Sequence, residues 1–159
     1  DFSTRGVRQS EQIEVLRALL AEEVLDYTGK YHRIDQAGIN PRPSKPVPIW
    51  FGGSAPALIR RCARLGDGWI PLMGPSPAAA EIITALRQQR EAANKPWDQF
   101  SILAQAQYAG GTPERWQSHA EKWRGLGATH MAIATHNAGE TDVDGHLARI
   151  EAYFKAVRS

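Results

Sequence analysis

The sequence predicts an α/β fold of four parallel strands alternating with helices, arranged as the second half of a (β/α)8 TIM-type barrel. Through residues 48–159, short apolar runs bounded by glycine or proline are each followed by a stretch with apolar residues three and four positions apart. Parallel strands need such long crossovers, so this alternation favours a parallel sheet covered by helices. A complete barrel usually takes about 250 residues, whereas this chain has 159. We therefore expect a single partial-barrel domain over residues 1–159.

The region before the repeating units predicts a helix and an irregular excursion. Residues 6–26 form the expected helix, because their apolar residues fall on one stripe. The stripe comprises Ile13, Leu16, Leu20 and Val24. Residues 27–47 predict a hairpin or extended excursion, since Gly29 stands between aromatic and β-branched residues. The prolines between positions 41 and 48 then exclude a helix or a central strand, which makes this stretch a surface connection.

The βα units from 48 to 159 give four expected strands, each followed by a helix. The strands are expected at 49–51, 68–72, 100–108 and 129–135. Two of the helices have a recognisable start, because Ser76 and Thr112 are residue types that cap helices and each is followed by a proline. Proline is favoured at the first helical position, so these helices are expected to begin near residues 77 and 113.

Composition indicates an ordinary globular protein of the cytoplasm. The net charge is +2 and the charges of both signs are interspersed, so no single-sign field favours nucleic acid or an anionic membrane. Cys62 is the sole cysteine, which excludes an internal disulfide and fits a reducing compartment. No stretch approaches the ~20 apolar residues of a membrane span. We expect a cytoplasmic protein that binds neither nucleic acid nor membrane.

The most informative local motif is Gly52-Gly53-Ser54, which joins an expected strand to the start of a helix. Glycines let backbone N–H groups approach an anion closely, and the helix dipole favours negative charge at this end. The motif therefore fits a phosphate-binding turn. The alternative is that the glycines only form a tight turn and Ser54 only caps the helix.

Five motifs stand in a fixed order, mainly in the first half of the chain. They are residues 5–19, Tyr27–Tyr31, Asn40–Pro43, Pro48–Ser54 and 60–71, the last of which contains Gly66–Trp69. In this order and spacing they resemble the luciferase-like monooxygenases, a family of flavin- or deazaflavin-dependent oxidoreductases. The resemblance implies a (β/α)8 barrel that binds FMN or the deazaflavin coenzyme F420 at its C-terminal face. The motifs do not distinguish the two cofactors.

The same resemblance implies which residues bind the cofactor. The segment that matches Gly52, Gly53, Ser54 and Ala55 helps to hold the cofactor phosphate in that family. Arg8 is a weaker candidate for the same anion, the alternative being a solvated charge on the first helix. The four strands that supply most contacts to the cofactor ring in the family are absent from these 159 residues. Catalytic residues are therefore not assigned.

The function implied by the resemblance is that of an oxidoreductase. A reduced flavin or deazaflavin would reduce or mono-oxygenate a small organic substrate, and this chain would supply the cofactor-phosphate side. Two alternatives remain: a catalytically incomplete remnant or assembly subunit of the same fold, and a phosphate-binding barrel enzyme of another family. A half barrel leaves strand edges and one apolar face uncovered, so we expect a homo-oligomer or pairing with a missing N-terminal half.

The remaining candidate polar residue is His136, which follows the last expected strand at the edge where barrel enzymes keep their chemistry. It is either a substrate or cofactor contact or an ordinary loop residue. His119 and His130 fall on an expected helix and strand and are interpreted as structural. Cys62 lies on the apolar face of a helix, and no histidine pair has metal-ligand spacing. No metal site is predicted.

Overall fold

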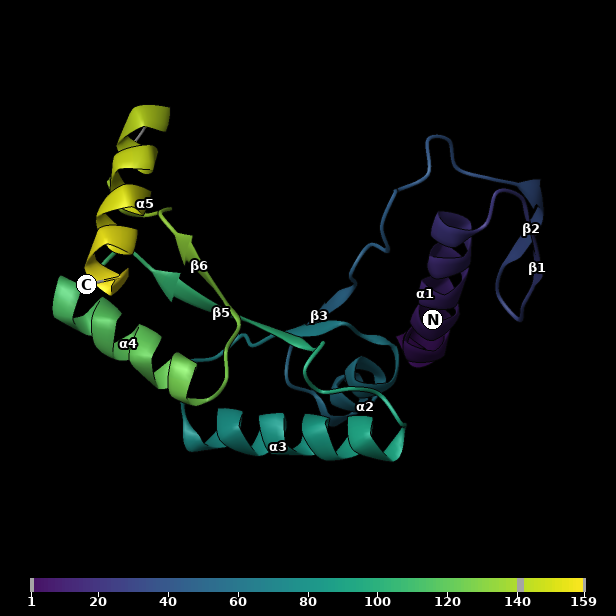
Figure 1. The fold of residues 1–159 in the computed structure, drawn as a ribbon, viewed down its shortest axis with the longest axis horizontal. Coiled ribbons are helices and arrows are strands. Elements are labelled where there is room, and N and C mark those ends of the chain that lie inside the picture. Colours follow the sequence, from purple (N-terminus) through teal and green to yellow (C-terminus); the bar gives the residue numbers. More distant parts are fainter. Residues whose placement is uncertain (1, 140–141, 159) are drawn as a thin grey trace.

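The computed structural model describes residues 2–139 and 142–158. A helix and a hairpin come first, and four strand–helix units follow (Figure 1). The helices are η1 (Phe2–Thr4), α1 (Arg5–Ala21), α2 (Pro56–Leu65), α3 (Pro77–Ala92), α4 (Pro113–Gly125) and α5 (Val143–Arg158). The strands are β1 (Leu25–Thr28), β2 (Arg33–Ala37), β3 (Trp50–Gly52), β4 (Gly68–Ile70), β5 (Ser101–Gln107) and β6 (His130–Ala134). None of the described helices is long and apolar enough to cross a bilayer.

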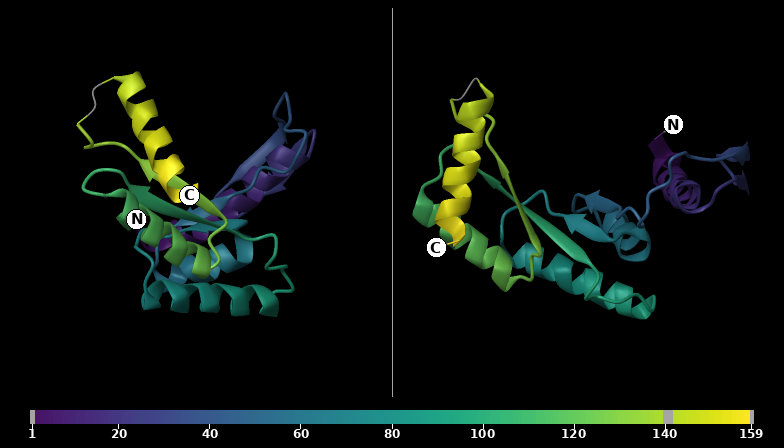
Figure 2. Two further views of the ribbon diagram at one scale, coloured as in Figure 1. Left: turned by 60° about the vertical axis from the view of Figure 1, so that its left-hand side comes forward. Right: turned by 45° about the horizontal axis from the view of Figure 1, so that its top comes forward.

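The main sheet has four strands in the order β3-β4-β5-β6, and every neighbouring pair is parallel. This confirms the predicted α/β fold with a parallel sheet. Helices α2 to α5 lie on one side of the curved sheet, whereas no described element covers the other, concave side (Figures 1 and 2). The outer edges of β3 and β6 pair with no further strand among the described residues. The arrangement is that of a partial barrel.

Side chains along β5 alternate between the two faces of the sheet. Ile102, Ala104 and Ala106 are buried beneath the helices, while Gln105 and Gln107 are exposed on the concave side. The buried face belongs to two apolar clusters, one under α2 and α3 and one between β5, α4 and α5. Burial on one face only explains why the strand sequence alternates between apolar and polar residues.

The concave face is filled at the edge where the strands begin. The ring of Trp50, from β3, lies 5.0 Å from the ring of His130, from β6. The indole passes over Gly68, where an added Cβ would lie 2.7 Å from the Trp50 Cδ1 atom. Side chains of the two outermost strands therefore touch across the sheet, as expected when a sheet is curved toward barrel closure.

Helix α1 is shorter than the predicted helix over residues 6–26. It ends at Ala21, and Leu25 is a buried residue of β1 that pairs with Ala37 of β2. Of the predicted stripe, Ile13 is buried, whereas Leu16 and Val24 are 43% and 52% exposed. The apolar residues near position 25 fit the end of a helix and the start of a strand equally well, so periodicity alone could not place the boundary. A hairpin is present as β1 and β2, but it begins at Leu25, two residues before the predicted excursion over residues 27–47.

The hairpin is fastened to α1 by one carboxylate. Glu11 accepts hydrogen bonds from the backbone N–H groups of Lys30, Tyr31 and His32, at 3.0, 2.8 and 2.7 Å. Its Oε1 atom also lies 3.0 Å from the Nδ1 atom of His32. Burial raises the pKa of Glu11, but these donors outweigh burial and hold the pKa below its ordinary value.

Helix α1 is joined to the sheet by a second polar contact. Arg17 donates to the Asp67 carboxylate and to the Leu65 carbonyl, and the same carboxylate accepts the N–H of Ile49. Asp67 stands just before β4, and Ile49 just before β3. This contact joins the beginnings of both strands to α1.

Candidate functional site

The Gly52-Gly53-Ser54 turn leaves the sheet at the C-terminal end of β3, the edge at which barrels and open α/β sheets bind ligands. Gly53 has φ +119°, and a Cβ there would lie 3.2 Å from the Leu58 Cδ1 atom. A residue with a side chain rarely adopts this backbone conformation, so glycine is required at position 53. A Cβ at Gly52 would meet only the Ile70 carbonyl oxygen, at 3.9 Å. Space above Gly52 is therefore open.

Both backbone groups of Gly53 are engaged within the protein. Its N–H donates to the Ile70 carbonyl at 3.2 Å, and its carbonyl accepts from the Trp69 Nε1 atom at 2.7 Å. Trp69 is fully buried. The hydrogen bond from Trp69 to the turn was not predicted from the sequence. Gly53 thus shapes the turn, and the donors that remain for an anion come after it.

The start of α2 lacks a side-chain cap. Its N-cap residue is Ala55, with no side-chain cap hydrogen bond, and Pro56 follows at the first helical position. The alternative in which Ser54 caps this helix is therefore wrong, because the helix begins one residue too late for it. Within the described hydrogen bonds, the N–H groups of Ser54 and Ala55 donate to no protein acceptor. No acidic residue stands in the first turn of α2.

The other helices of the sheet satisfy their first turns with side chains. The Ser76 hydroxyl accepts from the Ala79 N–H at 3.3 Å at the start of α3. The Thr112 hydroxyl accepts from the Arg115 N–H at 3.4 Å at the start of α4. Near the start of α5, the Asp142 carboxylate accepts from the Gly145 N–H at 2.7 Å. The predicted starts at Ser76 and Thr112 are therefore confirmed, and α2 differs from these three helices.

This arrangement suits an oxyanion chemically. Unpaired backbone N–H groups at a helix N-terminus carry partial positive charge, and an anion placed there accepts hydrogen bonds and interacts favourably with the helix dipole. The turn after β3 supplies such groups from Ser54 and Ala55, together with the Ser54 hydroxyl as a further donor. Gly52 leaves room for the approach. The residues present therefore fit a phosphate group, and their role stays a prediction.

The other two predicted site residues, Arg8 and His136, belong to other elements than this turn. The Arg8 guanidinium lies 5.8 Å from the centre of the Tyr31 ring, in the contact between α1 and the hairpin. His136 is exposed after β6. Beside it, the Thr135 hydroxyl lies 2.9 Å from the Nδ1 atom of His146, from α5. Sequence reasoning did not single out His146, because nothing in the local pattern links it to the end of β6. Binding by Arg8 and His136 remains a prediction.

Cys62 is enclosed in the core and donates to the Gly68 carbonyl at 3.4 Å. Burial raises the pKa of its thiol to about 12, which keeps it protonated at neutral pH. This residue is structural.

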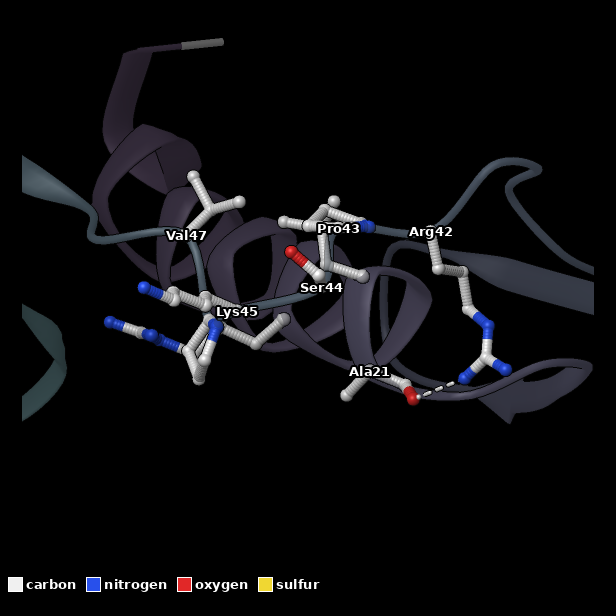
Figure 3. A pocket seen from close by; sticks show the side chains of 9 residues that line it. Ala21, Arg42, Pro43, Ser44, Lys45 and Val47 are labelled. Atoms are coloured by element: carbon white, nitrogen blue, oxygen red, sulfur yellow. Dashed lines mark hydrogen bonds between the residues drawn. The ribbon is translucent and has the colours of Figure 1, made fainter.

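A hollow of about 520 Å³ lies between α1 and residues 42–47 (Figure 3). The Arg42 side chain closes one end by donating to the Ala21 carbonyl at 2.9 Å. Residues 42–47 lead into the first residue of β3, so this hollow lies where strands begin. Barrel enzymes keep their active sites at the C-terminal edge of the strands, whereas residues at the N-terminal edge serve stability. The hollow is therefore separate from the candidate site.

Comparison with known proteins decides the family. The model of the luciferase-like monooxygenase family matches residues 1–155. The chain belongs to this family. The alternative of a barrel enzyme from an unrelated family is thereby set aside.

Two of the curated relatives that match in sequence are F420-dependent enzymes. It is 32% identical over 125 residues to the F420-dependent glucose-6-phosphate dehydrogenase of Nakamurella multipartita, a match covering 77% of this chain and 37% of that protein. It is 29% identical over 97 residues to the enzyme of the same name from Amycolatopsis mediterranei, covering 60% of this chain and 29% of that protein. The matches thus span only 37% and 29% of the lengths of these two relatives.

Solved structures agree on the fold. An F420-dependent secondary alcohol dehydrogenase, in complex with an F420–acetone adduct, superposes with TM-score 0.79 and 15% identity, over 99% of this chain and 63% of that one. The EDTA monooxygenase of a Chelativorans species superposes with TM-score 0.57 and 18% identity, over 77% of this chain and 35% of that one. At these identities the similarity establishes the partial-barrel fold.

Proposed function

We propose that this luciferase-like chain forms the phosphate-binding side of an oxidoreductase that uses FMN or coenzyme F420. The observation that carries the proposal is the turn after β3, in which the N–H groups of Ser54 and Ala55 stand unpaired at an uncapped helix start. The turn lies at the edge of the sheet where barrels of this type bind cofactors. When bound, either cofactor would supply hydride-transfer or oxygen-activating chemistry.

The role of this chain's residues is to bind and orient. Ser54 and Ala55 would donate backbone hydrogen bonds to the phosphate, and the Ser54 hydroxyl would donate a third. Gly53 would hold the turn open through its bonds to Ile70 and Trp69. Arg8 would add a charge only if α1 and the hairpin bring it toward the anion, and His136 would contact substrate at the end of β6.

A matched pair of flavins tests this assignment. FMN and riboflavin share the ring and the ribityl chain, and only FMN carries the phosphate. Charge-assisted hydrogen bonds contribute about 1.5–3 kcal/mol each, so FMN should bind at least about tenfold more tightly than riboflavin, as measured by fluorescence quenching. Equal affinity for the two flavins would contradict a phosphate site. A parallel titration with coenzyme F420 would show which cofactor the chain prefers.

A second proposal concerns what completes the barrel. The edges of β3 and β6 are unpaired among the described residues, and the concave face is uncovered. Large apolar side chains are also exposed, including Val7 at 60% and Leu72 at 70%. Exposed strand edges and apolar surface favour association. We infer that a polypeptide with the four remaining βα units, or a second copy of this chain, covers this face.

Size-exclusion chromatography with light scattering tests the second proposal. A folded chain should elute as a dimer or larger species, or should become soluble and monodisperse only when a polypeptide with the remaining four βα units is co-expressed. A folded, stable monomer that gains nothing from such a partner would contradict it. Without a completing partner, the chain would serve as an assembly subunit or a catalytically incomplete remnant that binds cofactor phosphate without turning over substrate.

A further inference from the structure

A second hollow opens at the C-terminal edge of the sheet, and residues 52–55 of the turn after β3 do not line it. Its volume is about 570 Å³, and it lies between residues 71–74, which follow β4, and the start of α4. The polar residues lining it are Gln105, Gln107, Arg115, Trp116 and His119. A hollow of this size accommodates a small organic molecule.

The charged group that lines this hollow is positive. Arg115 is the one charged residue among those that line it. Its side chain is exposed, and the hydrogen bond it donates, to the Gly110 carbonyl, is long at 3.4 Å. Most of its donors therefore face water or a ligand, and a guanidinium presents a planar pair of donors that matches a carboxylate or a phosphate.

Acidic and basic neighbours lie outside this hollow, along the same helix. Glu114 and Lys122 line an adjoining hollow of about 430 Å³, which also includes Arg115 and His119. Hydrogen bonds from the backbone N–H of Glu114 and from the Thr112 hydroxyl hold the pKa of Glu114 below its ordinary value. This carboxylate is therefore ionised, and its hydrogen bonds are made to groups at the start of α4. Neither Glu114 nor Lys122 lines the 570 Å³ hollow, so Arg115 is the one charged residue that lines it.

His119 presents a donor to the same space. Its Nδ1 atom is enclosed without a hydrogen-bond partner, and burial, with a smaller effect of Lys122, lowers the pKa of the ring, so the ring is neutral at pH 7. A proton on Nδ1 would be a buried donor without an acceptor, which is unfavourable, so the neutral ring keeps its proton on Nε2. His119 lines both hollows, and the Nε2–H group therefore serves as a second donor beside Arg115.

The opposite wall is apolar. Leu72 is 70% exposed and Met73 is partly buried, and both follow β4 at the rim of the hollow. An exposed leucine beside donors on one side makes the hollow amphipathic. A ligand that fills it needs an anionic end and an apolar body.

We propose that this hollow binds a small organic carboxylate. The carboxylate accepts hydrogen bonds from the Arg115 guanidinium and the His119 Nε2–H group, and the apolar body lies against Leu72 and Met73. The site is formed by residues 71–74, the end of β5 and the start of α4, and it requires neither the turn after β3 nor a bound cofactor. Success or failure of this proposal is therefore independent of the cofactor assignment.

Two probe molecules of similar shape separate the effect of ligand charge on binding from the effect of ligand size. Benzoate carries the carboxylate, and benzamide replaces it with an uncharged group. In amide NMR spectra of the chain, benzoate should shift the signals of Gly110 and Gly111 at the rim, with an affinity about tenfold or more above that of benzamide. Inorganic phosphate, which lacks an apolar body, should bind more weakly than benzoate. Equal binding of benzoate and benzamide, or phosphate binding as tight as benzoate binding, would overturn the proposal.

Two arginine substitutions on one helix provide the matched variants. Arg115→Gln should weaken benzoate binding about tenfold, because the charged donor pair is lost. Arg124→Gln removes an exposed arginine from the last turn of α4, outside this hollow, and should leave benzoate affinity unchanged. Both side chains are exposed, so both variants should fold. Unchanged affinity in Arg115→Gln, or equal losses in the two variants, would overturn the proposal.

Discussion

The turns after β3 and β5 share a pair of glycines and a helix-starting proline, but they differ in the residue that caps the helix. Each strand runs into a pair of glycines, and each helix that follows has a proline at its first position. After β5 the residue before that proline is Thr112, whose hydroxyl accepts a first-turn N–H. After β3 it is Ala55, which has no side-chain acceptor. The first turn of α4 therefore has a side-chain acceptor for an N–H group, whereas the first turn of α2 keeps N–H donors that a ligand could use.

A helix N-terminus can bind an anion when its own sequence provides no side-chain acceptor for its first N–H groups. Both helices have the same dipole, and both turns contain glycines with positive φ, Gly53 at +119° and Gly110 at +71°. The glycines therefore do not distinguish the two turns. The cap residue does, since a side chain that accepts the first N–H groups removes the donors that an anion would use.

The largest effect is expected from Gly53→Ala. A Cβ at φ +119° strains the backbone and presses on Leu58, which should cost about 1–3 kcal/mol of unfolding free energy. The loss of the turn should also abolish FMN binding. Urea denaturation measures the first effect and fluorescence titration the second. Gly52→Ala is the control, because its Cβ meets open space; its stability should change by under about 1 kcal/mol.

The next effect concerns Ala55→Asp, which gives α2 the cap that α4 already has. The carboxylate should accept a first-turn N–H and stabilise the helix by about 0.5–1 kcal/mol. It should also repel the phosphate, so FMN should bind at least about tenfold more weakly. Ala55→Ser adds a cap without charge and should weaken binding less. If Ala55→Asp binds FMN as the original chain does, the phosphate lies elsewhere.

A smaller effect is expected where the cap is already present. Thr112→Ala should cost about 1 kcal/mol of unfolding free energy, because the Arg115 N–H loses its acceptor. Ser54→Ala is its counterpart after β3. Ser54 is not the cap of α2, so stability should stay within about 0.5 kcal/mol while FMN binding weakens. Equal destabilisation by the two substitutions would show that Ser54 has a structural role.

The smallest effect is a pH dependence that arises from α4. Burial lowers the pKa of His119 in the folded chain, whereas the unfolded chain binds a proton near pH 6.5. The unfolded state therefore binds more protons below that pH, so His119 destabilises the folded chain as pH falls from about 6.5 toward the folded pKa. Urea denaturation at several pH values should show that the free energy of unfolding falls less at acid pH in His119→Gln than in the unmodified chain. An identical pH profile would contradict burial of this ring.

Much of the framework could be predicted from the sequence. The alternation of apolar runs and helical stripes gave the parallel sheet, and Ser76 and Thr112 marked two helix starts, because these signals are local. The end of α1 at Ala21 could not be predicted, since the strand that begins at Leu25 is set by pairing with Ala37. Tertiary pairing overrode the helical pattern there.

The candidate site was predicted in position but not in detail. Gly52 and Gly53 placed the turn, yet Gly53 donates its N–H to Ile70 and accepts from Trp69, both contacts made across strands. The cap is Ala55 rather than Ser54 because α2 begins one residue later than a Ser54 cap would require. The hollow beside Arg115 and His119 was not predicted, because it forms between segments far apart in the sequence.

The most direct measurement of the central claim compares backbone amides at the two turns. Amide NMR spectra of the chain, recorded as FMN is added and again with riboflavin, report on each N–H group separately. We expect FMN to shift the Ser54 and Ala55 signals strongly and riboflavin to leave them in place, while the signals of the first turn of α4 do not change with either flavin. Shifts at the start of α4 with none at Ser54 and Ala55 would contradict it.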